Sequence, residues 1–534
     1  MNVSVHDLSL EDLVGQVLCP SIGSDDDPKK VLTMLREQKP GGIFVTHMSK
    51  EMVKFYTDAA NAVSKVPVVV CSDVENGPEI AVTGTGTIPK AMACAAAGST
   101  ALVREAAEAS AAICRENGIH WTFSPVADIN YNFRCPEINA RAFSDDPQIV
   151  AQMCKAFVEG IQKDHRMMAC VKHFPGQGMD DRNAHFCTVI NPMSREEWMS
   201  TYGMVYKTAF EAGVGSVMMA HCALPFCEEA SDPVLGGPPA ILSKSVMTDL
   251  LKKELGFRGC IVSDAMSMVG AVARCPLDQL AVNFLKAGGD VVLFNEKHDR
   301  DHILEAVKSG ELPLERLQDA VSRILQMKQW LGLGDPMPPA PAHRPLPEIA
   351  RDIARRSITV QRDLEGLLPL SIPAGSKILF VNVINNRKEQ PVTGHEFDAM
   401  KEVFQEEGYL VDVLTTPSHR QIEETVGNYE AVLINYRLDV DTYHGGTLRL
   451  GWDNIFHFWR GYIFNAKRLI CTSFGDPYKL YDMPFLKTYL NAYCDTPECQ
   501  QAAAQVILGK IPSRGKNPVA LEGFFSREVQ LSDN

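Results

Sequence analysis

One stretch of the sequence places residues capable of acid–base chemistry beside a strand end. Lys172 and His173 close a short apolar run, the chain continues Phe-Pro-Gly-Gln-Gly to Gly178, and His185 follows seven residues later. Pro175 ends the strand, and the two glycines permit backbone angles that other residues avoid. We therefore expect Lys172 and His173 to be held firmly and His185 to lie on a mobile loop. Because imidazole titrates near neutral pH, this stretch predicts an enzyme.

The elements that must position these residues follow a regular alternation. The apolar run 167–171 has the length and composition of a buried parallel strand. Seven similar runs alternate with helical patterns over roughly the first 330 residues, which predicts an α/β fold with a (β/α)8 TIM-type barrel. A doubly wound open sheet is the alternative. The predicted strands are 14–19, 42–46, 66–71, 121–126, 167–171, 217–220, 260–262 and 291–294.

Most of the predicted strands end in a polar side chain. In a barrel these side chains would converge on one mouth, where the active sites of such folds lie. A buried structural hydrogen bond could explain any one of them, but their recurrence at the same end of successive strands favours a site. The residues are His47, Asp73, Asp128, Lys172 with His173, His221, Asp264 and Asn295.

A second domain is predicted after a proline-rich linker. The amphipathic helix 314–331 closes a barrel domain at 1–334, the linker spans 335–350, and a smaller α/β sandwich domain occupies 351–534. This second domain could complete the pocket, form a homodimer, or only stabilise the barrel, and a loop with His444 and Arg449 could reach the barrel mouth. Its predicted strands are 378–383, 410–414, 431–435 and 469–473.

The bulk composition excludes several classes of partner. A net charge of -14 without a Lys/Arg block argues against nucleic acid and anionic membranes, and no segment reaches the apolar length of a membrane span. Fifteen scattered cysteines are typical of a reduced compartment, so we predict a cytoplasmic protein. The pairs Cys222/Cys227 and Cys494/Cys499 lack a second ligand pair, and we expect no metal or cofactor.

The stretch from Lys172 to His185 resembles the signature of the glycoside hydrolase family 3 β-N-acetylhexosaminidases, Lys-His-Phe-Pro-Gly-His-Gly followed by Asp-Ser-His. The resemblance implies that His185 is the acid/base residue. Two positions depart from the signature: Gln177 replaces the glycine-flanked histidine, and Asn183 replaces the aspartate that partners the catalytic histidine.

A second segment of the resemblance supplies a nucleophile. Residues 257–268 run through a strand that ends on Asp264, and the family resemblance implies that this aspartate attacks the sugar. An aspartate that caps the next helix is the structural alternative.

Further segments resemble the sugar-binding parts of the same family. Residues 72–77 match its Asp-x-Glu-x-Gly turn, which implies that Asp73 binds sugar hydroxyls. Residues 141–147 match its Arg-Ser-Phe-Gly-x-Asp-Pro segment, so Arg141 is expected to reach the sugar together with Lys172 and His173. A salt bridge from Arg141 to Asp145 or Asp146 is the structural alternative. The list of substrate-binding candidates is Asp73, Arg141, Lys172, His173 and His221.

The resemblance implies a retaining exo-β-glycosidase that releases terminal N-acetylglucosamine from a small carbohydrate or glycoside through a covalent glycosyl-enzyme. Three alternatives stay open. They are a β-glucosidase of the same family, whose acid is a glutamate after the barrel; a β-N-acetylglucosaminide phosphorylase; and a non-catalytic sugar-binding protein.

Asn183 bears on the chemistry because an amide orients an imidazole but carries no charge to stabilise imidazolium. We expect a weaker base than in the family. Asp180 or Asp181 could approach His185 instead, or the substitution could accompany a different substrate or be an introduced change.

Overall fold

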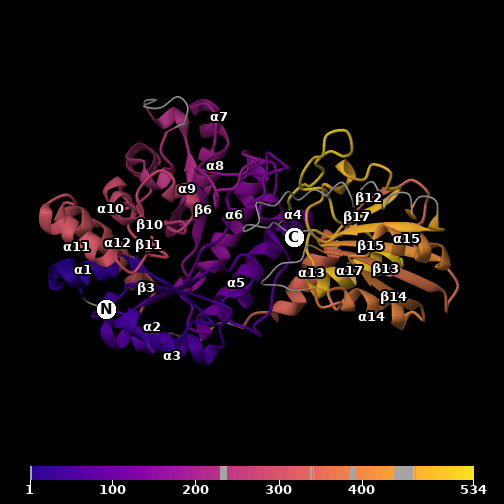
Figure 1. Ribbon diagram of the computed structural model, residues 1–534, viewed down its shortest axis with the longest axis horizontal. Coiled ribbons are helices and arrows are strands. Elements are labelled where there is room, and N and C mark those ends of the chain that lie inside the picture. The colour runs from indigo at the N-terminus through magenta and orange to yellow at the C-terminus, as the bar shows by residue number, and fades with distance from the viewer. Residues whose placement is uncertain are drawn as a thin grey trace. The chain divides into compact units, whose positions relative to one another are not determined.

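The computed structural model describes residues 3–228, 237–336, 339–340, 342–384, 392–437, 461–462 and 465–533, so His444 and Arg449 lie outside the described residues. The chain divides into two compact units (Figure 1). Unit 1 comprises Met1–Thr87, Val103–Cys135 and Pro147–Leu346, and unit 2 comprises Ile88–Leu102, Pro136–Asp146 and Pro347–Asn534. Two short segments of the predicted barrel domain thus cluster with the C-terminal part of the chain.

Unit 1 contains a closed barrel of parallel strands. Its first strand is interrupted at Pro20. One part of this strand pairs with the last strand, through Leu18↔Val292, and the other part pairs with β3 (Gly42–Thr46). Parallel bridges Trp121↔Met168 and Val262↔Val291 join the remaining sheets. This closed order confirms the predicted (β/α)8 barrel over the open sheet. Its strands are β1 (Leu18–Cys19) with β2 (Ser21–Gly23), β3 (Gly42–Thr46), β4 (Val69–Ser72), β5 (Trp121–Thr122), β6 (Cys170–Phe174), β8 (Ser216–Met219), β10 (Cys260–Ser263) and β11 (Val292–Leu293).

The first strand is shorter than the run 14–19 predicts, because that run begins inside a helix. Ser9 and Asp12 form a capping box, in which the Ser9 hydroxyl accepts from the Asp12 N–H at 3.2 Å and the Asp12 carboxylate accepts from the Ser9 N–H at 3.1 Å. The cap starts α1 at Leu10, and the helix continues to Gln16 before β1 begins at Leu18.

Helices surround the strands of the barrel (Figure 1). The predicted helix 314–331 is α12, which buries Leu317, Val321 and Ile324 on one side. The helices are α1 (Leu10–Gln16), α2 (Pro28–Gln38), α3 (Lys50–Val63), α5 (Thr100–Glu116), α6 (Pro147–Ile161), α7 (Arg195–Ser200), α8 (Tyr202–Glu211), the π-helix η7 (Ser245–Glu254), α9 (Val269–Val272), α10 (Leu277–Ala287), α11 (Asp299–Ser309) and α12 (Leu314–Trp330).

The barrel interior is a packed core and not a pore, as the fold requires. Phe123 stacks on Phe44 with ring centroids 5.9 Å apart and meets Trp121 edge-on at 4.8 Å. The buried Trp121 indole N–H donates to the Ser216 hydroxyl at 2.7 Å. Because side chains fill the barrel interior, a ligand site is expected at the carboxyl ends of the strands.

Unit 2 is built on one six-stranded sheet in the order β12-β17-β16-β15-β13-β14. Four of its strands match the predicted runs: β13 (Lys377–Ile384), β14 (Leu410–Thr415), β15 (Ala431–Arg437) and β16 (Leu469–Ser473). The prediction omitted the other two strands: β12 (Thr359–Asp363), a half-buried edge strand of mixed polarity, and the buried β17 (Thr488–Asn491), to which β12 runs antiparallel. The helices are α4 (Ala91–Ala96), α13 (Leu346–Ser357), α14 (Asp398–Glu406), α15 (His419–Thr425) and α17 (Pro497–Ile507).

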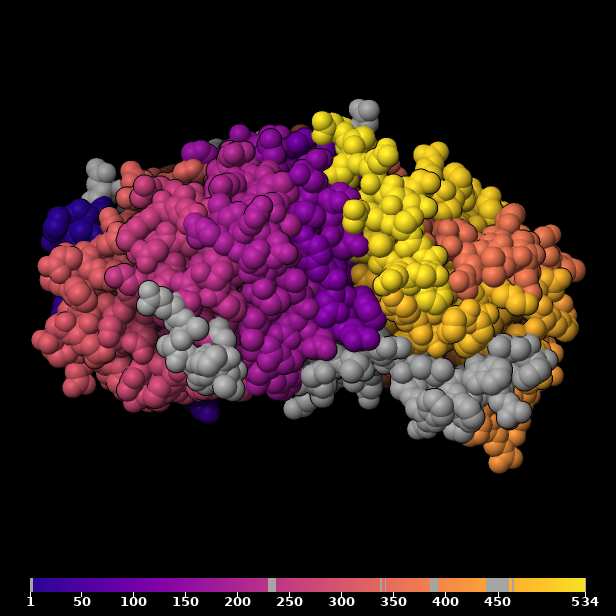
Figure 2. All heavy atoms as spheres, turned by 90° about the horizontal axis from the view of Figure 1, so that it is seen from above, coloured from indigo at the N-terminus to yellow at the C-terminus, as the bar shows by residue number. Residues whose placement is uncertain are grey.

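The C-terminal segment covers part of unit 2 and is yellow in Figure 2. It is tied down by the Asp145 carboxylate, which accepts from the Ala520 N–H at 2.8 Å, and by the Ser532 carbonyl, which accepts from the Thr100 N–H at 3.0 Å. Among the described residues, no helix is both long and apolar enough to cross a bilayer.

Candidate active site

Seven of the eight predicted site residues lie in unit 1, near the carboxyl ends of its strands. Asp73 directly follows β4, Lys172 and His173 are in β6, His221 comes two residues after β8, and Asp264 directly follows β10. The loop after β6 carries the other two residues, Asn183 and His185. The strands are parallel, so their carboxyl ends meet at one mouth of the barrel.

Lys172 is a buried cation shared by two carboxylates. Its Nζ lies 2.7 Å from Asp73 Oδ1 and 2.6 Å from Glu75 Oε1, and its side chain is only 4% exposed. The Asp73 side chain is 40% exposed. The ion pairs therefore fix Asp73 in place while leaving its surface open to accept hydrogen bonds from a ligand.

His173 is held by the fully buried Asp128. The Asp128 carboxylate lies 2.7 Å from His173 Nδ1 and accepts the backbone N–H of Gln177 at 2.6 Å. Because Nδ1 faces the carboxylate, the imidazole presents its Nε2 edge away from Asp128. One carboxylate thus orients both the histidine and the start of the following loop.

The two glycines of this loop serve close packing. Gly176 and Gly178 have φ values of 114° and 103°, and a side chain at Gly176 would overlap the ring of Tyr202. The Tyr202 hydroxyl donates to the carbonyl of Gln177 at 2.6 Å. In this structure the first part of the loop is therefore buried and firmly held.

Asn183 holds His185 through a single oxygen. Asn183 Oδ1 accepts the backbone N–H of His185 at 2.9 Å and lies 2.9 Å from the ring Nδ1. A backbone N–H can only donate, so the shared atom must be the amide oxygen, and the ring Nδ1 must carry a proton. Nε2 is then the nitrogen able to exchange a proton with a ligand.

Asp180 does not take the place of the missing carboxylate. It pairs with the Arg182 guanidinium at 2.5 Å and accepts the backbone N–H of Ile190 at 2.9 Å. These bonds lower the pKa of Asp180, although burial opposes the shift as the largest single effect. Asp180 thus holds Arg182 and Ile190 together, and Asp181 is exposed.

The loop of His185 is tied to the segment after Asp264. The His185 carbonyl accepts from the Val269 N–H at 3.2 Å, and the Ala184 carbonyl accepts from the Gly270 N–H at 3.0 Å. A Cβ atom at Gly270 would lie 2.5 Å from the Ala184 oxygen, so only glycine fits this approach. Ala184 and Met268 also share a small apolar cluster.

Asp264 is a partly exposed carboxylate in a positive environment. Burial alone would raise its pKa, but the charges of His173 and His221, the Ala265 N–H that donates to Oδ1 at 2.7 Å, and Lys172 together lower it. Asp264 is therefore ionised at neutral pH, as an attacking carboxylate must be.

His221 contacts the residue that follows Asp264. It has no exposed surface, and its Nε2 lies 2.9 Å from the Ala265 carbonyl, which can only accept. This bond connects the end of β8 to the residue after Asp264. The contact of His221 with a substrate stays a prediction.

Arg141, unlike the other seven predicted residues, belongs to unit 2. It ends the short helix η3 (Asn139–Arg141), and its guanidinium donates to the Glu137 carbonyl at 2.8 Å. The carboxylates of Asp145 and Asp146 pair with Arg527 at 2.7 and 2.8 Å. The role of Arg141 at a sugar stays a prediction.

Two residues that support the site were not among the predicted catalytic and substrate-binding residues. Glu75 and Asp128 lie behind Lys172 and His173 and fix their positions. Both occur in segments that the sequence singles out, since Glu75 is in the Asp-x-Glu-x-Gly turn and Asp128 follows a predicted strand. The sequence does not show that these two carboxylates contact Lys172 and His173 of β6, and that contact is what assigns them to the site.

A closed barrel with an oriented histidine, an ionised aspartate and a buried ion-pair cluster at its mouth defines an α/β-barrel enzyme. Residues 9–327 match the glycosyl hydrolase family 3 N-terminal domain. The chain belongs to glycoside hydrolase family 3, as its sequence motifs predict.

Relatives extend the similarity over nearly the whole chain. A β-N-acetylglucosaminidase/β-glucosidase of Cellulomonas fimi is 30% identical, with 97% of this chain and 95% of the relative covered. A solved β-glucoside phosphorylase bound to 2FGlc is 28% identical, with a TM-score of 0.87 and 97% and 95% covered. A solved β-N-acetylglucosaminidase of Paenibacillus sp. str. FPU-7 is 25% identical, with a TM-score of 0.85 and 96% and 99% covered.

Proposed function

We propose that the protein is a retaining exo-β-glycosidase that releases terminal β-linked N-acetylglucosamine. In the first step Asp264 attacks the anomeric carbon while His185 Nε2 donates its proton to the leaving oxygen, giving a covalent glycosyl-enzyme. In the second step the neutral His185 removes a proton from water, which attacks the anomeric carbon and displaces Asp264.

The observation that carries this proposal is the orientation of His185 by Asn183. Because the ring Nδ1 donates to Asn183 Oδ1, the proton exchanged with the substrate belongs to Nε2. The loop bonds to Val269 and Gly270 tie this histidine to the chain just after Asp264. The two reacting groups are thus held by connected segments of the same mouth.

The sugar specificity is inferred from the relatives and from the polar groups at the mouth. Asp73, Lys172 and His173 offer a carboxylate, an ammonium group and an imidazole to sugar hydroxyls. The Cellulomonas fimi relative is named for both N-acetylglucosamine and glucose release. We place N-acetylglucosamine first because the His185 loop resembles the hexosaminidase signature, with departures at Gln177 and Asn183.

Phosphate is the second candidate acceptor. One similar solved structure is a β-glucoside phosphorylase, and the Asn183 amide adds no negative charge beside His185. A phosphate anion near the anomeric carbon would meet less repulsion here than beside an aspartate. Attack by phosphate in the second step would yield the sugar phosphate in place of the free sugar.

The deciding experiment is release of p-nitrophenol from the β-N-acetylglucosaminide and from the β-glucoside, each with and without inorganic phosphate. Faster turnover of the acetamido sugar supports the proposal. Formation of a sugar 1-phosphate, detected by mass spectrometry, would assign the phosphorylase reaction instead. Preference for the glucoside would overturn the substrate assignment.

The nucleophile is tested separately with a 2-fluoro sugar that carries an activated leaving group. The wild-type chain should gain the mass of one fluorosugar, and peptide mapping should place it on Asp264. Asp264→Asn should remain unlabelled, whereas Asp278→Asn, on the outer helix α10, should label normally. Label on another carboxylate would refute the assignment. The cytoplasmic location and a homodimer stay predictions.

A further inference from the structure

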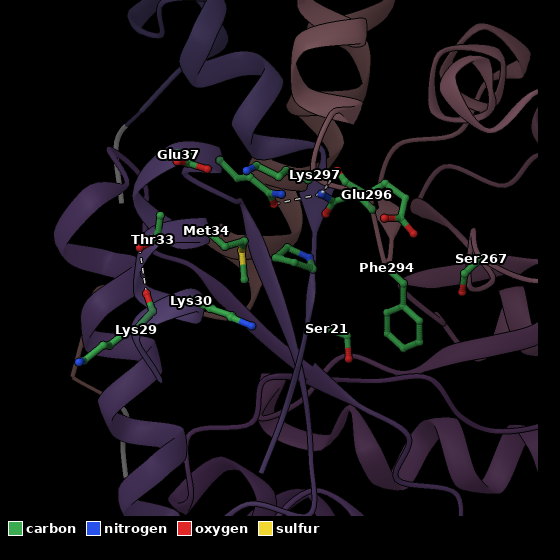
Figure 3. A pocket seen from close by; sticks show the side chains of 13 residues that line it. Ser21, Lys29, Lys30, Thr33, Met34, Glu37, Ser267, Phe294, Glu296 and Lys297 are labelled. Atoms are coloured by element: carbon green, nitrogen blue, oxygen red, sulfur yellow. Dashed lines mark hydrogen bonds between the residues drawn. The ribbon is translucent and has the colours of Figure 1, made fainter. Parts of the chain in front are cut away.

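Two cavities of unit 1 lie at opposite ends of the barrel strands. The cavity in Figure 3 is lined by Ser267 and Phe294, which follow β10 and β11, so it belongs to the mouth. A smaller cavity, of about 50 Å³, is lined by Arg166, which precedes β6, and by residues of α5 and α6. Because the strands are parallel, this second cavity lies at their amino-terminal ends, away from Asp264 and His185.

Arg166 is a buried cation with a single hydrogen bond. The residue is only 7% exposed, and its Nη2 donates to the Pro339 carbonyl at 2.8 Å. Its Nε and Nη1 are buried and have no hydrogen-bond partner among the described residues, none of whose carboxylates forms an ion pair with it. Burying an ionised guanidinium without acceptors destabilises the folded chain. An acceptor from outside the chain is therefore favoured at this position.

A second buried arginine adds positive charge beside Arg166. Arg115, near the carboxyl end of α5, is 8% exposed, and its Nη2 donates to the Leu331 carbonyl at 2.7 Å. Burial lowers the pKa of Arg115 to about 10, and the charge of Arg166 contributes to this shift. The pKa of His120 is lowered well below its usual value by burial and by the charges of Arg115 and Lys328. The interior at this end of the barrel is thus positive.

Two carboxylates also line the cavity, and neither neutralises the buried guanidinium. Glu108 is engaged by Lys163, whose Nζ lies 2.8 Å from its Oε2. Asp164 is exposed, so its charge is screened by solvent and salt. Arg166 therefore remains available as the anchor for an anion.

We propose that this cavity binds one small oxyanion, such as inorganic phosphate, on the Nε and Nη1 groups of Arg166. A volume of about 50 Å³ holds a few water molecules or one such ion, whereas small-molecule sites begin at roughly 300 Å³. Guanidinium N–H groups suit the oxygens of phosphate and sulfate, and such charge-assisted hydrogen bonds are short and strong.

The anion stabilises the segment that follows α12. Arg115 binds the carbonyl of Leu331 and Arg166 binds that of Pro339, so both arginines contact this segment. An oxyanion on Arg166 restrains the same guanidinium that holds Pro339. The amino-terminal face of such a barrel serves stability, whereas catalysis takes place at the opposite face. We therefore expect the ion to stabilise the fold without taking part in turnover.

Trp330 supplies an optical probe for this site. Its ring stacks on that of His165, the residue before Arg166, with centroids 4.3 Å apart. Titration of the wild-type chain with phosphate at constant ionic strength should change the tryptophan fluorescence saturably, and Trp330→Phe should remove this change. At ten times the dissociation constant the melting temperature should rise by about 2 °C. Sulfate should act in the same way.

Three variants make the assignment specific. Arg166→Met keeps an apolar side chain but removes the guanidinium, so it should abolish both responses while leaving kcat on an aryl glycoside unchanged. Asp164→Asn removes the opposing charge at an exposed position and should tighten phosphate binding by about 2- to 3-fold. Because this second change is on the surface, it tests the site even if Arg166→Met does not fold. Arg258→Met, at an exposed arginine, is the matched control and should respond as wild type.

Phosphate at the mouth, where it is a candidate acceptor, is distinguishable from phosphate on Arg166. Phosphate at the mouth should compete with the substrate and should be bound equally by the wild type and by Arg166→Met. Equal responses of these two chains, or no response to phosphate and sulfate, would overturn the proposal. A response to chloride as large as that to phosphate would refute the oxyanion assignment.

Discussion

Asn183 Oδ1 accepts two hydrogen bonds from His185, one from the backbone N–H and one from the ring Nδ1, both at 2.9 Å. The amide thus orients the ring and selects its tautomer as a carboxylate in the same place would. It differs from a carboxylate only in charge. Orientation and charge are therefore separable at this position by single substitutions.

Asn183→Asp should keep both hydrogen bonds and add a negative charge beside His185. Because a nearby carboxylate favours imidazolium, the limb of the pH–rate profile that reports His185 should move to higher pH by about one pH unit. Measuring kcat/KM for an unactivated glycoside from pH 5 to 9 checks this. Asn183→Ala, which loses orientation as well, should lower kcat without that displacement. An unmoved limb in Asn183→Asp would show that His185 does not govern the profile.

His185→Ala should depress turnover most where the leaving group needs protonation. General acid catalysis contributes about 10²- to 10⁴-fold, so loss of that order is expected for a disaccharide and much less for an aryl glycoside with a good leaving group. Comparing kcat/KM across leaving groups of graded pKa measures the difference. His343→Ala, an exposed histidine of unit 1, should behave as wild type. Equal losses on all substrates would remove the acid role.

Gly270→Ala tests whether the segment after Asp264 positions the His185 loop. The added methyl would press on the carbonyl of Ala184 and displace the loop. A small misplacement of a catalytic group costs about 10²-fold in rate. We expect kcat to fall on poor leaving groups while labelling of Asp264 by a 2-fluoro sugar persists. Gly427→Ala in unit 2, where the nearest atom lies 3.7 Å from the new methyl, controls for replacement of a glycine. Like Gly270, Gly427 does not have a positive φ, so neither substitution adds that backbone strain. Loss of labelling in Gly270→Ala alone would indicate a wider disruption.

The barrel was predictable because its strands are short apolar runs that end in polar residues. Gly42–Thr46 in the barrel has the predicted bounds, as does Leu469–Ser473 in the sheet of unit 2. Val14 and Gly15 were placed in a strand because apolar runs in strands and buried helix ends look alike. The edge strand β12 was missed because its half-buried residues do not form an apolar run.

Candidate site residues could be proposed from the sequence only where a contiguous motif contains them. Asp264, His185 and Asn183 belong to contiguous signatures, whereas the support of Lys172 by Glu75 joins residues about 100 positions apart in the sequence. The placement of Arg141 in unit 2 likewise depends on long-range packing that a single sequence does not contain.

Lys328 carries a pH dependence of stability. It is fully buried in α12, and its Nζ donates to Gln16 Oε1 at 2.7 Å. Burial lowers its pKa from 10.5 to about 7, partly opposed by Cys19 and Cys260. Between about pH 7 and 10.5 the unfolded chain therefore holds a proton that the folded chain has released.

This difference in bound protons decides whether stability rises or falls with pH. The free energy of unfolding should rise with pH over that window through Lys328, by at most about 1.4 kcal/mol per pH unit. Lys328→Met should remove this rise, although loss of the bond to Gln16 lowers stability at every pH. Urea unfolding followed by tryptophan fluorescence from pH 6.5 to 9.5 measures the slope, with the exposed Lys54→Met as the control. A wild-type slope retained in Lys328→Met would assign it to other groups, because the missing Gln16 bond shifts the curve without tilting it.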